Sequence, residues 1–146
     1  MNLVILASAR GESNTLKAIQ KLCPVSDYEL IDLRSKRIEL YDYEHSNNAG
    51  DDFLGIVQKM AQSDVIVFAT PVYWYSMSGL MKVFLDRFTE LLSTHRLIGK
   101  ALKGKAAYLI STGSDSELPP GFESPFKLTS DYFEMKYIGA FYLPLK

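Results

Sequence analysis

Continuous apolar runs of strand length recur along the 146 residues of this chain, and amphipathic helical patterns separate them. Such runs are typical of strands that are buried on both faces, because a half-exposed strand alternates between apolar and polar residues. The runs lie at residues 3–7, 28–33, 65–69, 106–110 and 137–143, the second alternating more than the others. Strands that alternate with helices predict a parallel sheet with helices on both faces.

Four helices are expected between these strands. The strongest pattern covers residues 78–93, where Leu80, Phe84, Phe88 and Leu91 form one apolar stripe. The other helical patterns cover residues 13–22, 51–62 and 124–135. The order predicts a single α/β domain over residues 1–146, with a five-stranded sheet in the flavodoxin-like order 2-1-3-4-5. The sequence ends after the fifth strand, so we expect the last helix of such a domain to be absent.

Composition narrows the class of protein. A net charge of -1 argues against a nucleic-acid-binding protein, which usually carries a basic face. The single cysteine, Cys23, excludes an intrachain disulfide and a cysteine-rich metal site, and it fits a reducing compartment. No apolar run is long enough for a membrane span and no basic leader precedes the first run, so we expect a cytoplasmic protein. His45 and His95 lack matching carboxylates, so no metal site is predicted.

Ligands bind such a sheet beyond the carboxyl ends of its strands, at the switch point between the first and third strands. Three segments of this sequence follow the expected strand ends there. The first is S-A-R-G-E-S-N-T, residues 8–15, the second begins at residue 70, and the third at residue 111.

The first segment is predicted to bind a phosphate. It opens a helix, whose free N–H groups and dipole favour an anion, and the guanidinium of Arg10 fits phosphate oxygens. It lacks both the P-loop and the G-x-G-x-x-G pattern, which argues against ATP and a dinucleotide bound in the Rossmann manner. The alternative is a well-capped helix start with a surface arginine. The candidate residues are Ser8, Arg10, Ser13, Asn14 and Thr15.

The second and third segments are predicted to form apolar and main-chain walls of the same site. Three adjacent aromatics in residues 70–79 are unusual in a loop unless they contact something, either a ligand, the following helix or another subunit. Small residues in 111–115 let the backbone approach a ligand closely. The candidates are Pro71, Val72, Tyr73, Trp74, Tyr75, Ser76, Ser111, Thr112 and Gly113.

Residues 5–15 and 70–88 resemble the NADPH-dependent FMN reductase family of flavodoxin-like proteins, which includes quinone and azo reductases. The first family motif matches at Ser8, Arg10, Ser13 and Thr15. The second and more specific motif matches at Pro71, Tyr73, Gly79, Met81, Lys82, Asp86 and Arg87. Ala7 departs from the family pattern, because it stands where the family has glycine.

The resemblance implies FMN as cofactor, with its phosphate in the first segment and its isoalloxazine between the second and third. It implies an enzyme that passes electrons from NADPH or NADH through FMN to a quinone, a flavin or a similar small acceptor. No catalytic side chain is expected, because the flavin carries the chemistry. We also expect a homodimer, with the helix at 78–93 and the loop at 70–77 near the partner. Lys82, Asp86 and Arg87 are interpreted as structural or interface residues.

Two alternatives stay open at this point. A flavodoxin-like electron carrier would be expected to carry a strongly acidic face and a T-x-T-G-N-T first loop, whereas this chain is nearly neutral and has Arg10. The second alternative is a flavin-binding module that does not turn over a substrate.

A loose basic run before the fourth strand is expected to be solvated surface, and the alternative is that it contacts the 2′-phosphate of NADPH. It consists of Arg96, Lys100, Lys103 and Lys105.

Overall fold

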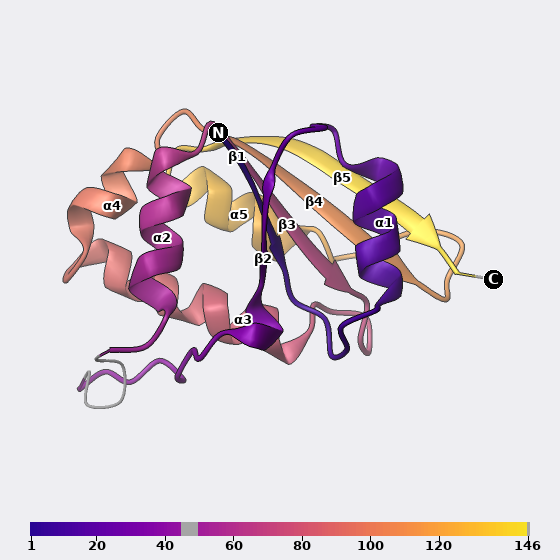
Figure 1. Ribbon diagram of the computed structural model, residues 1–146, viewed down its shortest axis with the longest axis horizontal. Coiled ribbons are helices and arrows are strands. Elements are labelled where there is room, and N and C mark those ends of the chain that lie inside the picture. The colour runs from indigo at the N-terminus through magenta and orange to yellow at the C-terminus, as the bar shows by residue number, and fades with distance from the viewer. Residues whose placement is uncertain (45–49, 146) are drawn as a thin grey trace.

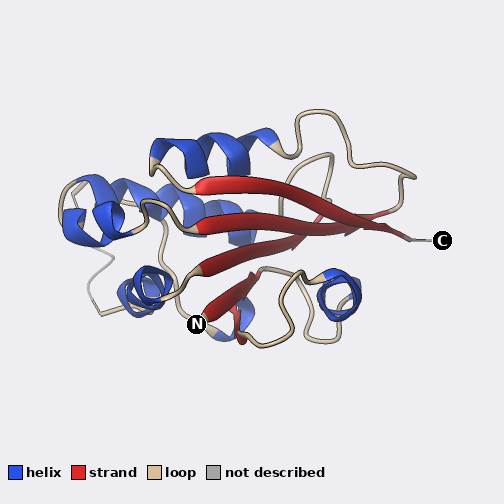
Figure 2. Cartoon of the chain, turned by 90° about the horizontal axis from the view of Figure 1, so that it is seen from above, coloured by secondary structure: helices blue, strands red, loops and turns tan. Residues whose placement is uncertain are grey.

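The computed structural model describes residues 1–44 and 50–145, which form a parallel five-stranded sheet with helices on both faces (Figures 1 and 2). The strand order is β2-β1-β3-β4-β5, which confirms the predicted topology. The strands are β1 (Asn2–Leu6), β2 (Glu29–Asp32), β3 (Val65–Pro71), β4 (Ala106–Gly113) and β5 (Lys136–Pro144).

Helices cover the two sheet faces unequally. The α-helices are α1 (Asn14–Leu22), α2 (Phe53–Gln62), α3 (Gly79–Asp86), α4 (Arg96–Ala101) and α5 (Ser124–Tyr132). The described residues also form the 3-10 helices η1 (Leu33–Ser35) and η2 (Arg87–Leu92). In Figure 1, α1 lies in front of the sheet and α5 behind it. The larger apolar core packs under α2, α3 and α5, and the smaller one packs under α1.

Local sequence explains the elements that flank the site. Leu3 to Leu6 are all buried, as expected for a strand with helices on both sides. Helix α1 begins after Ser13, whose side chain accepts a hydrogen bond from the Leu16 N–H at 3.0 Å. Ala18 and Ile19 on α1 are fully buried against the sheet. The cap and the buried stripe therefore place the first turn of α1 at the carboxyl end of β1.

The prediction of one helix over residues 78–93 was wrong. Helix α3 ends at Asp86, and the chain continues as the 3-10 helix η2. In a 3-10 helix, side chains three residues apart eclipse, so Arg87 and Glu90 meet and both become buried. Helix α4 was not predicted either, because its short sequence carries no strong apolar stripe.

Arg87 is the centre of a buried ionic network. Its Nη1 atom lies 2.6 Å from Oδ2 of Asp51 and 3.0 Å from the carbonyl oxygen of Glu39, and its Nε pairs with Glu90. Its guanidinium carbon lies 4.5 Å from the ring centre of Phe53. The network fastens the segment before α2 to η2, so the structural interpretation of Arg87 is confirmed.

Burial raises the pKa of the Asp51 carboxyl, but the hydrogen bonds from Arg87 and from two backbone N–H groups outweigh burial and hold it below its ordinary value. Those N–H groups belong to Glu39 and Phe53. The helical pattern predicted a helix from residue 51, but α2 begins at Phe53. Asp51 lies before the helix and takes part in the network.

Beyond β5 the described residues form no further helix, so α1 is the only helix on its face of the sheet. The rings of Tyr108 and Phe141 stack there with centroids 6.0 Å apart, and Phe141 remains 39% exposed. Among the described residues, no helix after β5 therefore covers this face of the sheet.

Candidate functional site

The three predicted segments meet at one edge of the sheet, where β1, β3 and β4 end. The Ala9 N–H donates a hydrogen bond to the hydroxyl oxygen of Tyr73 at 3.3 Å, which joins the first segment to the second. The Val72 N–H donates to the carbonyl oxygen of Thr112 at 2.9 Å, which joins the second segment to the third. The structure therefore brings the predicted residues together, while their part in binding remains a prediction.

The first segment has the chemistry of an anion site. Ser8, Ser13 and Thr15 are buried, and Arg10 is exposed. The Oγ1 atom of Thr15 is buried in the first turn of α1 and has no hydrogen-bond partner among the described residues. Asn14 opens the helix and is half-buried. A buried hydroxyl without a partner is costly, so a ligand that supplies one fits this turn.

The second segment contains a tight and strained turn. Tyr73 and Ser76 exchange backbone hydrogen bonds of 2.8 and 3.2 Å, and the two residues between them have left-handed φ angles. These angles are 50° at Trp74 and 68° at Tyr75, in a region that residues other than glycine rarely adopt. Trp74 is 92% exposed and Tyr75 is 68% exposed. The exposure of Trp74 contradicts the alternative that its ring packs on the following helix.

A buried polar network fastens this turn to its neighbours. The Ser78 hydroxyl donates to the carbonyl oxygen of Ala7 at 2.8 Å and accepts from the Met81 N–H at 3.1 Å. The Ser78 N–H donates to Oγ1 of Thr70 at 3.0 Å, and the Ser111 hydroxyl donates to the carbonyl oxygen of Thr70 at 2.7 Å. Thr70 and Ser78 were not among the predicted site residues. The sequence pattern that could have identified them is a polar residue at each end of the aromatic segment.

The third wall is the end of a strand, which corrects the prediction of a loop starting at residue 111. Strand β4 continues through Gly113 because β5 pairs with it as far as Pro144. The Thr112 hydroxyl donates to the carbonyl oxygen of Leu143 at 2.6 Å and is therefore already engaged. A Cβ atom on Gly113 would lie 2.9 Å from the hydroxyl oxygen of Tyr142. This wall can offer a ligand its main chain rather than its side chains.

Pro71 was likewise predicted in a loop and is the last residue of β3, paired with Thr112 of β4. The pairing between β3 and β4 thus extends into the second and third predicted segments. The free part of the second segment is shorter than expected and begins after Pro71.

The basic run lies at the opposite edge of the sheet, since it precedes the amino end of β4. Arg96, Lys100 and Lys103 are exposed, as predicted, but Lys105 is half-buried and donates to the carbonyl oxygen of Ser63 at 2.6 Å. This position gives no support to a contact with a nucleotide bound at the three segments. His95 precedes α4 near the same edge, and His45 lies outside the described residues.

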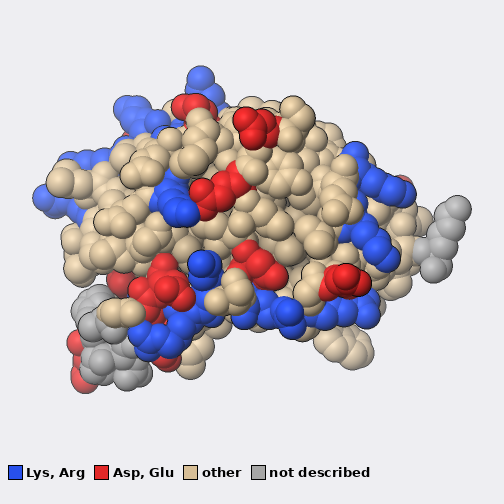
Figure 3. All heavy atoms as spheres, in the orientation of Figure 1, with Lys and Arg blue, Asp and Glu red and all other residues tan. Residues whose placement is uncertain are grey.

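Residues 1–44 and 50–145 contain no group of three His, Cys, Asp or Glu side chains suited to a metal ion. None of the helices in those ranges is long and apolar enough to cross a membrane. On the face shown in Figure 3, basic and acidic side chains are interspersed, and basic ones gather along α1.

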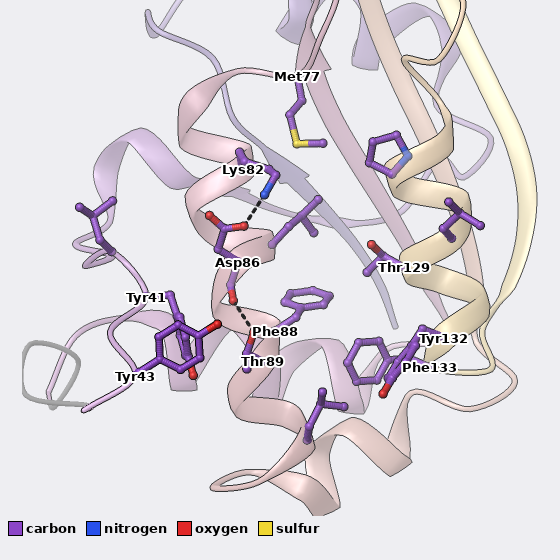
Figure 4. Close-up of a pocket in the computed structure, with 15 residues that line it drawn as sticks. Tyr41, Tyr43, Met77, Lys82, Asp86, Phe88, Thr89, Thr129, Tyr132 and Phe133 are labelled. Atoms are coloured by element: carbon purple, nitrogen blue, oxygen red, sulfur yellow. Dashed lines mark hydrogen bonds and ion pairs between the residues drawn. The ribbon is translucent and has the colours of Figure 1, made fainter.

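A separate groove of about 780 Å³ lies between α3 and η2 on one side and α5 on the other (Figure 4). Figure 4 shows Tyr41 and Tyr43 at one margin, Tyr132 and Phe133 at the other, and Met77 at the end nearest the aromatic turn. Most of its lining is apolar or aromatic. The exposed ion pair of Lys82 and Asp86 lies along α3.

The sequence matches the NADPH-dependent FMN reductase family over residues 2–139. The chain belongs to this family. Among curated relatives, the NAD(P)H-dependent FMN-containing oxidoreductase YwqN of Bacillus subtilis is 32% identical over 120 residues, 77% of this chain and 66% of the relative. General stress protein 14 of the same species is 33% identical over 95 residues, 58% of this chain and 54% of the relative. The match thus spans about half to two thirds of the length of these two relatives.

Solved structures share the fold. The Trp repressor binding protein of Bacillus subtilis has a TM-score of 0.78 at 24% identity, with 100% of this chain and 88% of that chain covered. General stress protein 14 of Treponema denticola, solved in complex with FMN, has a TM-score of 0.63 at 18% identity, with 99% and 86% covered. The flavodoxin-like fold of this FMN reductase family member is therefore confirmed.

Proposed function

We propose that the protein is an FMN-dependent NAD(P)H oxidoreductase that passes electrons to a quinone, a flavin or a similar small acceptor. Membership of the family supports this function, and so does the meeting of the three segments at one sheet edge. The observation that carries the proposal lies in the first turn of α1, close in sequence to Arg10. There the buried hydroxyl of Thr15 has no hydrogen-bond partner among the described residues. That turn fits the phosphate of FMN.

The residues of the site divide by the part of FMN that they would hold. Ser8, Arg10, Ser13, Asn14 and Thr15 would bind the phosphate. The aromatic turn, Val72 to Ser76, and the end of β4, Ser111 to Gly113, would bound the isoalloxazine. FMN, when bound, supplies the redox chemistry, so the chain has to bind, orient and shield it rather than donate protons.

The alternatives are a flavodoxin-like electron carrier and a flavin-binding module without turnover. Mixed charge over the face in Figure 3 does not favour a carrier, for which a strongly acidic docking face would be expected. Exposed rings at Trp74 and Tyr75 favour an enzyme, because an acceptor or a nicotinamide can reach the turn from solvent.

The test is an absorption spectrum of the purified protein with FMN, followed by NADPH or NADH under nitrogen. An enzyme is expected to give a perturbed flavin spectrum that bleaches within seconds and recovers when a quinone is added. A flavin that binds but stays oxidised with both donors would contradict the enzyme and favour a carrier or module. Failure to bind FMN at all would overturn the cofactor assignment.

We also propose that the protein forms a homodimer through the groove between α3, η2 and α5. Several of the residues that line the groove belong to the segment at 78–93, which was expected to lie near the partner. Several lining side chains are exposed, among them Tyr43, Leu92, Leu128 and Tyr132. Exposed apolar surfaces of this kind mark interfaces. A cytoplasmic location remains a prediction from the cysteine content.

A further inference from the structure

Arg34 lies against the first segment, although it is far from it in sequence. It belongs to η1, which directly follows β2, and so it lies at the same carboxyl edge of the sheet as the first segment. A Cβ atom on Gly11 would lie 2.8 Å from Nη2 of Arg34 and 3.6 Å from its guanidinium carbon. The guanidinium of Arg34 therefore touches the backbone beside Arg10.

No carboxylate among the described residues explains this position. The backbone N–H of Arg34 donates to Oδ1 of Asp32 at 3.0 Å, and its side chain forms no ion pair within residues 1–44 and 50–145. Arg37, three residues later, pairs with Glu39 and donates to the carbonyl oxygen of Gly50. Arg34 thus brings to the first segment a positive charge that forms no ion pair among the described residues.

We propose that Arg34 is a second arginine of the phosphate site and acts with Arg10 on a phosphate monoester. The inference rests on the proposed function and adds a residue from η1 to the proposed site. A phosphate monoester carries about 1.5 to 2 negative charges near pH 7, which two guanidinium groups balance better than one. Glu12 in the same segment is exposed and offsets part of one positive charge.

FMN and NADPH, the two cofactors of the proposed reaction, each carry a phosphate monoester. FMN has a 5′-phosphate that riboflavin lacks, and NADPH has a 2′-phosphate that NADH lacks. Two ratios therefore identify the source of the phosphate: the affinity for FMN relative to riboflavin, and kcat/KM with NADPH relative to NADH.

The experiment compares Arg34→Gln with Lys36→Gln in the FMN-loaded and FMN-free protein. Lys36 is exposed and lies two residues away, so its variant removes the same charge from the same segment. We expect Arg34→Gln to weaken FMN binding roughly tenfold with little change for riboflavin, because a charge-assisted contact is lost. Arg34→Lys should recover part of this loss, since it restores the charge without the planar fork.

A tenfold fall in the NADPH preference with unchanged FMN affinity would also support the inference and would assign Arg34 to the 2′-phosphate. The inference would be overturned if Arg34→Gln and Lys36→Gln gave the same FMN-to-riboflavin affinity ratio and the same NADPH-to-NADH ratio of kcat/KM. That outcome would leave the proposed function intact. Wild-type protein that binds neither FMN nor riboflavin would instead overturn both proposals.

Gly11→Ala offers an independent check that keeps every charge. Its added methyl group would meet the tip of the flexible Arg34 side chain and displace it. We expect Gly11→Ala to weaken FMN binding in the wild-type background and to have no further effect in Arg34→Gln. Equal effects in the two backgrounds would contradict the role of Arg34.

Discussion

Trp74 and Tyr75 adopt backbone conformations that aromatic residues rarely hold. Two-residue turns with left-handed φ at both positions normally contain asparagine and glycine. Each left-handed aromatic residue costs of order 1 kcal/mol or more, and this strain is common at ligand-binding sites. The two rings nevertheless stay exposed, so they do not recover the cost by packing in the monomer.

At this residue scale we predict that Trp74→Gly raises the free energy of unfolding by about 1 kcal/mol, because glycine accepts the left-handed conformation. The same change should weaken FMN binding, since it removes one wall of the site. Denaturant unfolding and a flavin titration measure the two effects. Ser76→Gly is the control, and it should not raise stability because Ser76 has no left-handed φ. Lower stability of Trp74→Gly would refute the strain argument.

At the scale of elements, Ser78 determines how α3 and the aromatic turn sit against β1. One hydroxyl caps α3 and also binds the carbonyl oxygen at the end of β1. We predict that Ser78→Ala lowers the free energy of unfolding by about 1–2 kcal/mol, the sum of a lost cap and a lost buried hydrogen bond. FMN affinity should fall as well, because the first and second segments are no longer held together.

Ser78→Thr is the matched control for that prediction, because it keeps the hydroxyl. It should retain most of the FMN affinity that Ser78→Ala loses, as measured by the same titration. If both variants bind FMN as the wild type does, the hydroxyl stabilises α3 without positioning the site.

At the scale of the whole molecule, Arg87 joins η2 to the segment that precedes α2. Arg87→Met would leave Asp51 and Glu90 charged and buried, and breaking a buried pair typically costs about 3–5 kcal/mol. Denaturant unfolding measures this loss. Lys82→Met is the control, since the ion pair of Lys82 with Asp86 is exposed and should contribute less than about 1 kcal/mol.

The same network predicts a pH dependence. The pKa of Asp51 is lower in the folded protein than in the unfolded chain, so its contribution is present at neutral pH. That contribution is lost as the pH falls below about 4, where the unfolded carboxyl binds its proton first. In Arg87→Met, protonation of Asp51 should instead raise the free energy of unfolding, because it removes a buried charge that has lost its arginine. Unfolding curves for both proteins between neutral and acidic pH would test this reversal.

The homodimer is also a property of the whole molecule. Leu128 on α5 is 64% exposed and lines the groove, whereas Leu97 on α4 is 81% exposed and does not. We predict that Leu128→Glu shifts sedimentation toward the monomer, because it buries a charge in an apolar interface, and that Leu97→Glu has no effect. A wild-type protein that sediments as a monomer at micromolar concentrations would contradict the proposal.

The sequence by itself determined the order of the five strands and predicted which segments meet at one edge of the sheet. Apolar runs, the Ser13 cap and the stripe on α1 are local signals, and a parallel sheet then brings the ends of β1, β3 and β4 to one edge. The family motifs added the expectation that this edge binds FMN. These features could be predicted because each depends on residues close together in the chain.

Only the tertiary structure decided the features that join distant residues. Ser78 bonds to Ala7 across 71 residues and Arg87 to Asp51 across 36, and neither pairing leaves a local pattern. The break between α3 and η2 follows from burying Arg87, and the contact of Arg34 with Gly11 follows from the position of β2 beside β1. Periodicity indicates which face of an element is buried, but hydrogen bonds and charges in the folded chain select the partner that it meets.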